Sequence, residues 1–124
     1  MNVVDSSGWL EYFGNSPNGE AFRAAVQDTE QLIVPTVSIY EVFKRIGAQA
    51  DEEEALKALG WMARGMIVDL TPEIAIHAAV LSLEHKLPMA DSLILATARL
   101  YEAELWTQDE HFAGLPGVNY FQKS

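Results

Sequence analysis

The sequence predicts a single α/β domain with three layers, in which a central parallel sheet of about five short strands is covered by helices on both faces. Three observations indicate this α/β/α class. Five short apolar runs with β-branched residues are too short for helices, and most lack the alternation of half-exposed strands. Segments of helical length separate these runs. The 124 residues have the length of one domain, so residues 1–124 are treated as a single unit.

Two predicted helices follow each of the first three predicted strands, which is the order that builds a parallel sheet. The strands are expected at Asn2–Val4, Leu32–Val34, Met66–Val68, Leu105–Thr107 and Val118–Phe121. The helices are expected at Ser7–Phe13, Pro17–Gln27, Ser38–Gly47, Asp51–Arg64, Pro72–Lys86 and Asp91–Glu102. The last two helices are apolar over most of their surface, which predicts that both pack flat on the sheet.

The composition restricts the class of function. Eight Lys and Arg residues against eighteen Asp and Glu residues give a formal net charge of −10. This charge argues against a protein that holds nucleic acid mainly through a basic face, but it allows chemistry on a phosphodiester whose charge a metal ion masks. The lack of cysteine excludes disulfides, thiolate metal sites and cysteine nucleophiles. No signal peptide or membrane span is recognisable, which predicts a cytoplasmic domain with no membrane partner.

Four carboxylates follow the predicted strands and can meet at one edge of the sheet. Asp5 ends the first strand, and Glu41 lies in the first turn of the helix after the second strand. Asp91 opens the sixth helix, and Asp109 follows the fourth strand. Open parallel sheets bind ligands beyond the carboxyl ends of their strands, and four carboxylates gathered there would repel one another unless a cation lay among them. An oxygen-only set without Cys or His selects Mg²⁺ or Mn²⁺ over zinc or copper.

Three of these acids also have a structural interpretation. Ser38 and Glu41 match the S-x-x-E capping box, and Asp91 is a suitable N-cap. Asp109 lies within a second such box. For any one of the three, the structural interpretation is favoured. Asp5 is different, because the serines that follow it could perform any capping of the next helix.

Four motifs extend this pattern along the chain from residue 2 to residue 112. They are VVDSS at residues 3–7, SIYEV at residues 38–42, ADSLILATA at residues 90–98 and LWTQDEHF at residues 105–112. In this order and spacing, the motifs resemble the PIN domain family, and within it the VapC-type ribonuclease toxins of prokaryotic toxin–antitoxin pairs. The resemblance implies a PIN-like nuclease domain that is a metal-dependent endoribonuclease and usually a homodimer, with RNA as its substrate and a cognate antitoxin as its partner.

The resemblance also assigns roles to residues. The four acids match the family's acidic tetrad of catalytic, metal-binding residues, and Thr107 matches its usual Ser or Thr near the fourth acid. Ser6 and Glu110 are supporting candidates, and Glu110 could replace Asp109 as the fourth ligand. A Mg²⁺ or Mn²⁺ ion held by Asp5 and Asp91 would activate a water for attack on RNA, leaving a 5′-phosphate and a 3′-hydroxyl.

Basic side chains near the acids are candidates for RNA binding. Lys44 and Arg45 follow Glu41 on the same helix face, where Arg45 could either pair with Glu41 or hold an RNA phosphate. Arg99 on the sixth helix is a further candidate. The histidines are interpreted as surface or helix-end residues and not as metal ligands, because no H-x-x-x-H pair is present. They are His77, His85 and His111.

Large apolar side chains form the candidate surface for the antitoxin. Trp9, Tyr12 and Phe13 form a helical stripe, and Trp61 and Met62 add bulk on the fourth helix. Such a stripe belongs either to the core or, where it is exposed, to a partner surface. With a net charge of −10, we expect the partner to present a basic, amphipathic helix.

Three other interpretations compete with the toxin. A receiver-type signalling module could use Asp5, Asp69 and Thr107, but serines follow Asp5 where it needs a second acid, and no Lys but Lys123 lies beyond Lys86. The other two are a catalytically silent binding module with the same fold, and a PIN nuclease that is no toxin and cuts DNA or processes precursor RNA.

Overall fold

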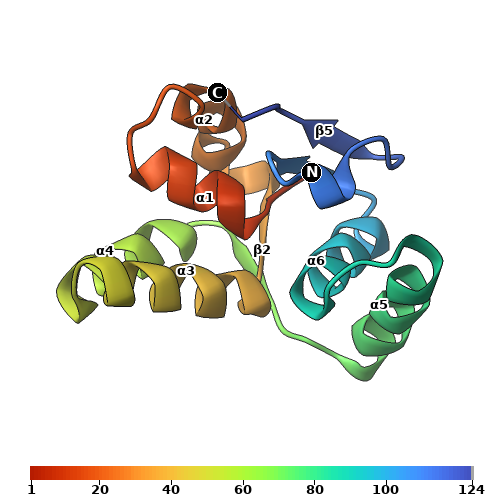
Figure 1. The fold of residues 1–124 in the computed structure, drawn as a ribbon. Helices are drawn as coiled ribbons and strands as arrows, with labels where there is room; N and C mark the ends of the chain where they lie inside the picture. The colour runs from red at the N-terminus through yellow and green to blue at the C-terminus, as the bar shows by residue number, and fades with distance from the viewer. Residues whose placement is uncertain (124) are drawn as a thin grey trace.

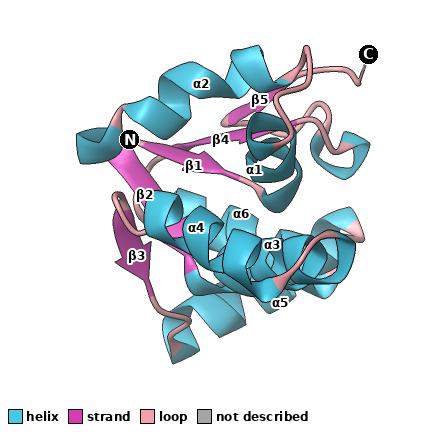
Figure 2. Cartoon of the chain, turned by 90° about the vertical axis from the view of Figure 1, so that its left-hand side faces the viewer, coloured by secondary structure: helices cyan, strands magenta, loops and turns pink. Residues whose placement is uncertain are grey.

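The computed structural model describes residues 1–123 and confirms the α/β/α class, with a five-stranded sheet covered by helices on both faces (Figures 1 and 2). The strands are β1 (Asn2–Val4), β2 (Leu32–Pro35), β3 (Met66–Val68), β4 (Glu104–Thr107) and β5 (Val118–Tyr120). The helices are α1 (Ser6–Phe13), α2 (Gly19–Gln27), α3 (Thr36–Gln49), α4 (Glu52–Met62), α5 (Pro72–His85) and α6 (Met89–Leu100). Two short 3₁₀ turns are η1 (Thr29–Gln31) and η2 (Glu110–Phe112).

The strand order places the predicted acids at one edge of the sheet. The order is β3-β2-β1-β4-β5, and every pair of neighbouring strands is parallel. The first strand is therefore central, with β2 and β4 on its two sides. Val4 lies opposite Trp106 in the register of β1 and β4, so the next residues, Asp5 after β1 and Thr107 at the end of β4, lie side by side.

Alternate residues of the strands face two apolar cores, as the period of a β-strand requires. Val3 packs with Ile94 of α6 on one face of the sheet. Val4 packs on the other face with Trp9 of α1 and Phe22 of α2. Figure 2 shows the strands between these two helical layers. The two cores fix the sheet between α1 and α6, the helices that flank the carboxyl ends of β1 and β4.

The structure corrects two expectations about burial. The fifth helix does not lie flat on the sheet: α5 packs mainly against α6, and Ile76, Val80 and Leu83 remain exposed. The strand β3 is not buried on both faces either, because it is an edge strand and leaves Met66 and Ile67 exposed. None of the helices within residues 1–123 has the length and apolar character needed to cross a bilayer.

Candidate active site

The four predicted acids line one cavity of about 520 Å³ at the carboxyl edge of the sheet. Each acid comes from a different place in the chain: the end of β1, the first half of α3, the first turn of α6 and the loop after β4. The sheet order and the parallel strands bring these four places together. They are Asp5, Glu41, Asp91 and Asp109.

Asp5 is the buried acid of the cavity, with 3% of its surface exposed. Its Oδ1 accepts hydrogen bonds from Ser7 Oγ at 2.8 Å and from the Gly8 amide at 2.9 Å, and its Oδ2 accepts one from Thr107 Oγ1 at 2.6 Å. A Cβ atom at residue 8 would lie 2.7 Å from Val4 Cγ1, so only glycine allows this close approach of α1 to β1. Burial raises the pKa of Asp5 to about 6, although these hydrogen bonds oppose the shift.

Hydrogen bonds of Thr107, at the end of β4, link Asp5 to Asp109. Thr107 donates to Asp5, and its hydroxyl accepts a hydrogen bond from the Asp109 amide at 2.9 Å. The neighbouring Gln108, which was not among the predicted site residues, is buried and donates from Nε2 to Glu11 at 2.8 Å. Thr107 and Gln108 thus fix the loop after β4 against β1 and α1, and they position Asp109 at the cavity.

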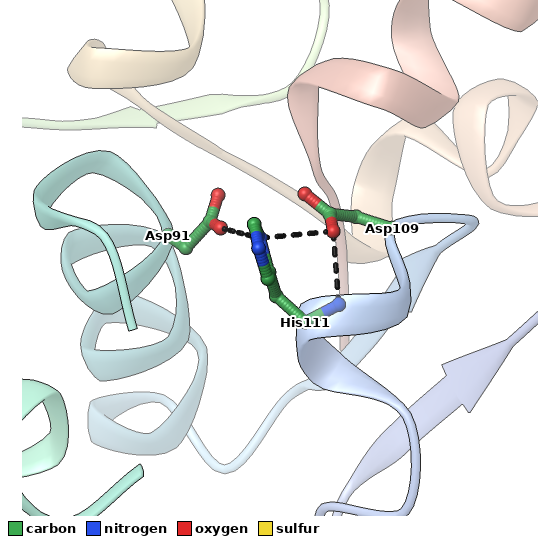
Figure 3. Close-up of side chains that lie close together, drawn as sticks. All are labelled: Asp91, Asp109 and His111. Carbon is green, nitrogen blue, oxygen red and sulfur yellow. Dashed lines mark hydrogen bonds and ion pairs between the residues drawn. The ribbon is translucent and has the colours of Figure 1, made fainter. Parts of the chain in front are cut away.

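Asp91 and Asp109 lie on either side of the His111 imidazole (Figure 3). Nδ1 of His111 is 3.0 Å from Asp91 Oδ2 and 3.1 Å from Asp109 Oδ1. Burial, then the charge of Asp109, raises the pKa of Asp91 to about 6, with His111 opposing the shift. The charge of Asp109, followed by the hydrogen bond to Asp91, raises the pKa of the imidazole. The ring lies at the surface, as expected for this histidine, but the short turn η2 also folds it back onto these two acids, which the sequence did not indicate.

Glu41 faces the same cavity from α3 and accepts a hydrogen bond from Ser6 Oγ at 2.5 Å. The carboxylate does not form a capping box, because α3 begins at Thr36 and Ser38 lies inside the helix. Within residues 1–123, Arg45 and Glu41 form no ion pair, so that structural interpretation of Arg45 is wrong. The hydrogen bond from Ser6, the residue after Asp5, instead connects Glu41 of α3 to the start of α1.

The other capping interpretations also change. The sixth helix begins at Met89 after Pro88, so Asp91 lies within the first turn and is not the N-cap. Asp109 does cap η2, through its hydrogen bond from the His111 amide at 2.9 Å. Asp5 caps α1, contrary to expectation, because the helix starts at the very next residue. Capping therefore accounts for one oxygen of Asp5, and it does not account for the approach of the four acids to one cavity.

Some of the other candidate residues line the cavity, and others lie outside it. Glu110 is exposed and lies outside the cavity, so the geometry favours Asp109 as the fourth acid. Lys44 and Arg45 line the cavity, together with Lys123, for which the sequence argument proposed no role. Arg99 lies elsewhere: its guanidinium donates to the Pro116 carbonyl at 3.4 Å and does not line the cavity. Arg99 therefore lies away from the four acids, and its role in RNA binding stays a prediction.

Burial also divides the aromatic candidates. Trp9 and Met62 are 0% and 1% exposed and belong to the core, so neither forms part of a partner surface. They are buried because α1 and α4 each direct this side chain into the apolar core on one face of the sheet. Phe13 and Trp61 instead line a groove of about 400 Å³ between α1, α3 and α4, in which apolar side chains lie beside charged ones of α3 and α4; it is here called the α1–α4 groove. Tyr12 is half-buried and lines a separate hollow.

The donor set at the cavity fits a divalent cation. Asp5 and Asp91 carry carboxylates whose ionised forms are disfavoured by burial and by neighbouring acids, and a cation would remove this penalty. The oxygens of Asp91 and Asp109 and the nitrogen of His111 lie within 4.8 Å of one another. Carboxylate oxygens suit Mg²⁺ or Mn²⁺. The imidazole adds a nitrogen that the expected oxygen-only set lacked.

The raised pKa values predict how the stability of the metal-free chain depends on pH. A carboxyl group whose pKa rises from 3.8 to about 6 on folding favours the folded state at low pH, and this contribution is lost as the pH rises toward 7. Asp5→Asn should therefore gain in melting temperature over the wild type, in chelator, between pH 4.5 and pH 7. Differential scanning fluorimetry measures this, and a difference that does not vary with pH would contradict it.

Comparisons with known proteins agree with this geometry. The PIN domain family model matches residues 3–118, and a search of curated proteins finds no significant match. A chain of a toxin–antitoxin complex from Klebsiella pneumoniae is 25% identical, with a TM-score of 0.83 over 99% of this chain and 100% of that chain. VapC20 of Mycobacterium tuberculosis is 11% identical, with a TM-score of 0.77 over 94% of this chain and 95% of that chain.

A chain of VapBC2 from Rickettsia felis has the same fold, with 14% identity and a TM-score of 0.75 over 98% of this chain and 97% of that chain. The receiver-type interpretation finds no support, because Asp69 is exposed and lies outside the cavity of the four acids. The fold, the acidic cavity and the match of the family model over nearly the whole sequence lead to the same assignment: this chain belongs to the PIN domain family.

Proposed function

We propose that this chain is a metal-dependent endoribonuclease and the toxin of a type II toxin–antitoxin pair. The convergence of four carboxylates from four separate elements on one cavity carries the proposal. A similar chain occurs in the toxin–antitoxin complex of Klebsiella pneumoniae, and VapC20 of Mycobacterium tuberculosis is described as a toxin that cleaves the sarcin–ricin loop. The first similarity supports an antitoxin as the partner, and the second supports RNA as the substrate.

In this proposal, Asp5 and Asp91 hold Mg²⁺ or Mn²⁺, and Glu41 and Asp109 complete the acidic set. When bound, the ion lowers the pKa of a coordinated water and neutralises charge on the scissile phosphate. Thr107 keeps Oδ2 of Asp5 in position through its 2.6 Å hydrogen bond. No histidine general base is needed in this scheme.

The basic side chains at the cavity hold the RNA backbone. Lys44, Arg45 and Lys123 line the same cavity as the acids, so phosphates on either side of the scissile bond can contact them. The chain as a whole is acidic, with a net charge of −10, and repels RNA. Binding therefore depends on this small group of cations together with the metal ion.

RNA cleavage with and without metal tests the proposal. The purified chain is incubated with bacterial total RNA, or with single-stranded DNA, in Mn²⁺ or in chelator. We expect Mn²⁺-dependent RNA fragments with 5′-phosphate ends, and intact DNA. Cleavage of DNA alone would favour the DNA nuclease alternative. Intact RNA and intact DNA in Mn²⁺ would contradict nuclease activity and favour the silent binding module.

The α1–α4 groove is where we place the antitoxin. Its apolar lining includes Phe13, Trp61 and Leu10, and it shares Leu10 and Arg45 with the acidic cavity. An amphipathic helix in the groove could therefore continue into the cavity, where an Arg or Lys of the antitoxin would meet the four acids. The charge of −10 favours such a basic partner.

A homodimer in the cytoplasm is part of the same proposal. Ile76, Val80 and Leu83 are 68%, 46% and 84% exposed, and their spacing puts them on one face of α5. We place the contact with a second copy on this face, because two such stripes are complementary across a two-fold axis.

A further inference from the structure

His111 is the one nitrogen donor in the group of side chains that, among the described residues, could hold a metal ion. Its backbone amide donates to Asp109 Oδ1 at 2.9 Å, so the turn η2 that carries it is attached to one of the acids. The side chain then reaches Asp91, twenty residues away in the sequence, at 3.0 Å. The ring is 55% exposed, so it is not placed there by burial in the apolar core.

The distances around the ring suit neighbouring ligands of a single ion. Metal–oxygen and metal–nitrogen bonds of about 2.1 Å at right angles place adjacent ligand atoms about 3 Å apart. Nδ1 of His111 lies 3.0 Å and 3.1 Å from the two nearest carboxylate oxygens. An ion can therefore take its place beside all three atoms with only small side-chain movements.

We propose that Nδ1 of His111 is a ligand of the divalent cation, together with Asp91 and Asp109, and that it shifts the preference of the site from Mg²⁺ toward Mn²⁺. This inference rests on the metal site of the proposed function. Mg²⁺ prefers an all-oxygen set, whereas imidazole nitrogen suits transition metals and affinity for nitrogen rises along the first-row series. In that case the imidazole of His111, and not the four carboxylates, causes the site to prefer Mn²⁺ over Mg²⁺.

Two other roles of His111 predict different results. If the imidazole only orients the carboxylates by hydrogen bonding, its removal changes the affinities for Mg²⁺ and Mn²⁺ by the same factor. If it stands in for the cation as an internal counter-charge, its removal raises both affinities. Only if the imidazole is a nitrogen ligand does its removal change the ratio of the Mn²⁺ affinity to the Mg²⁺ affinity.

The experiment compares the wild type with His111→Phe, which keeps an aromatic ring but has no nitrogen. Calorimetric titrations of the chelator-treated proteins give both metal affinities. We expect the Mn²⁺ affinity of His111→Phe to fall at least about tenfold and the Mg²⁺ affinity to change much less, since removing a group that merely orients a ligand already costs about 10- to 100-fold. The matched control is His85→Phe, because His85 also lies beside a carboxylate, Glu84, at 3.8 Å, but outside the cavity.

Pulsed electron paramagnetic resonance of bound Mn²⁺ gives a direct second readout. We expect a hyperfine coupling to ¹⁴N in the wild type and in His85→Phe, and its loss in His111→Phe. Mn²⁺ that binds and supports RNA cleavage without this coupling, or an unchanged affinity ratio, would overturn the inference and leave the proposed function standing. Failure of Mn²⁺ to bind at all would overturn both.

Discussion

Asp91→Asn is expected to lower the rate of RNA cleavage by about 10³-fold or more while the chain stays folded. Charge stabilisation by a metal ion contributes several kcal/mol to such reactions, and each 1.4 kcal/mol or so corresponds to a factor of ten in rate. The amide keeps the shape of the side chain but loses the charge that holds the ion. Cleavage rates of labelled RNA in Mn²⁺, with circular dichroism to monitor the fold, measure the effect.

The variant Asp5→Asn should behave in the same way. Asn is as good an N-cap as Asp, so α1 should keep its cap at the Gly8 amide. In chelator, both variants should melt above the wild type at pH 7, because each removes a carboxylate whose charge is disfavoured first by burial and then by neighbouring acids.

The matched control is Asp69→Asn. Asp69 also follows a strand, β3, but it is exposed and lies outside the cavity. Its replacement should leave the rate of cleavage unchanged. Full activity in Asp91→Asn or Asp5→Asn would contradict the metal-nuclease account.

Weaker binding of the antitoxin is the second large effect we expect, from changes in the α1–α4 groove. Phe13→Ala and Trp61→Ala should each raise the dissociation constant about 30-fold, since buried aromatic anchors at interfaces are typically worth about 2 kcal/mol or more. Trp61 is 51% exposed, so its replacement leaves the core intact even if loss of Phe13 disturbs the stacking on Trp9. Surface plasmon resonance with the partner protein measures both constants.

The partner itself is obtained by co-purification from the native host. We expect a small protein with a basic, amphipathic C-terminal segment, and light scattering on the complex also tests for two copies of this chain. Tyr101→Ala, which removes an exposed aromatic ring outside the groove, is the control and should bind normally. Recovery of the chain only as a free homodimer that is harmless when overproduced would contradict the toxin assignment.

The fold and the convergence of the acids were predictable because both follow from local patterns. Each strand is a short apolar run; Asp5 comes directly after the run that forms β1, and Asp109 comes two residues after the end of β4. A parallel sheet aligns such strand ends at one edge, so the spacing alone places these carboxylates together. The roles of the four acids in metal binding remain predictions that the variants above test.

The errors concern features that depend on tertiary packing. A helical stripe shows which face is apolar but not how deep it lies, so Trp9 was not distinguished from the half-buried Phe13 of the same helix. His111 joins Asp91 only because η2 folds back after β4, and no spacing rule relates residues twenty positions apart in two elements. Lys123 similarly reaches the cavity from the C-terminal segment.

The central claim is that the acids at the carboxyl edge of the sheet bind a divalent cation, and titration of the chelator-treated chain with Mn²⁺ by calorimetry tests it most directly. The account predicts saturable binding that Asp91→Asn abolishes. At a hundredfold excess over the dissociation constant, binding should raise the free energy of unfolding by about 2.7 kcal/mol, with a matching rise in melting temperature. No binding heat and an unchanged melting temperature in millimolar Mn²⁺ would contradict it.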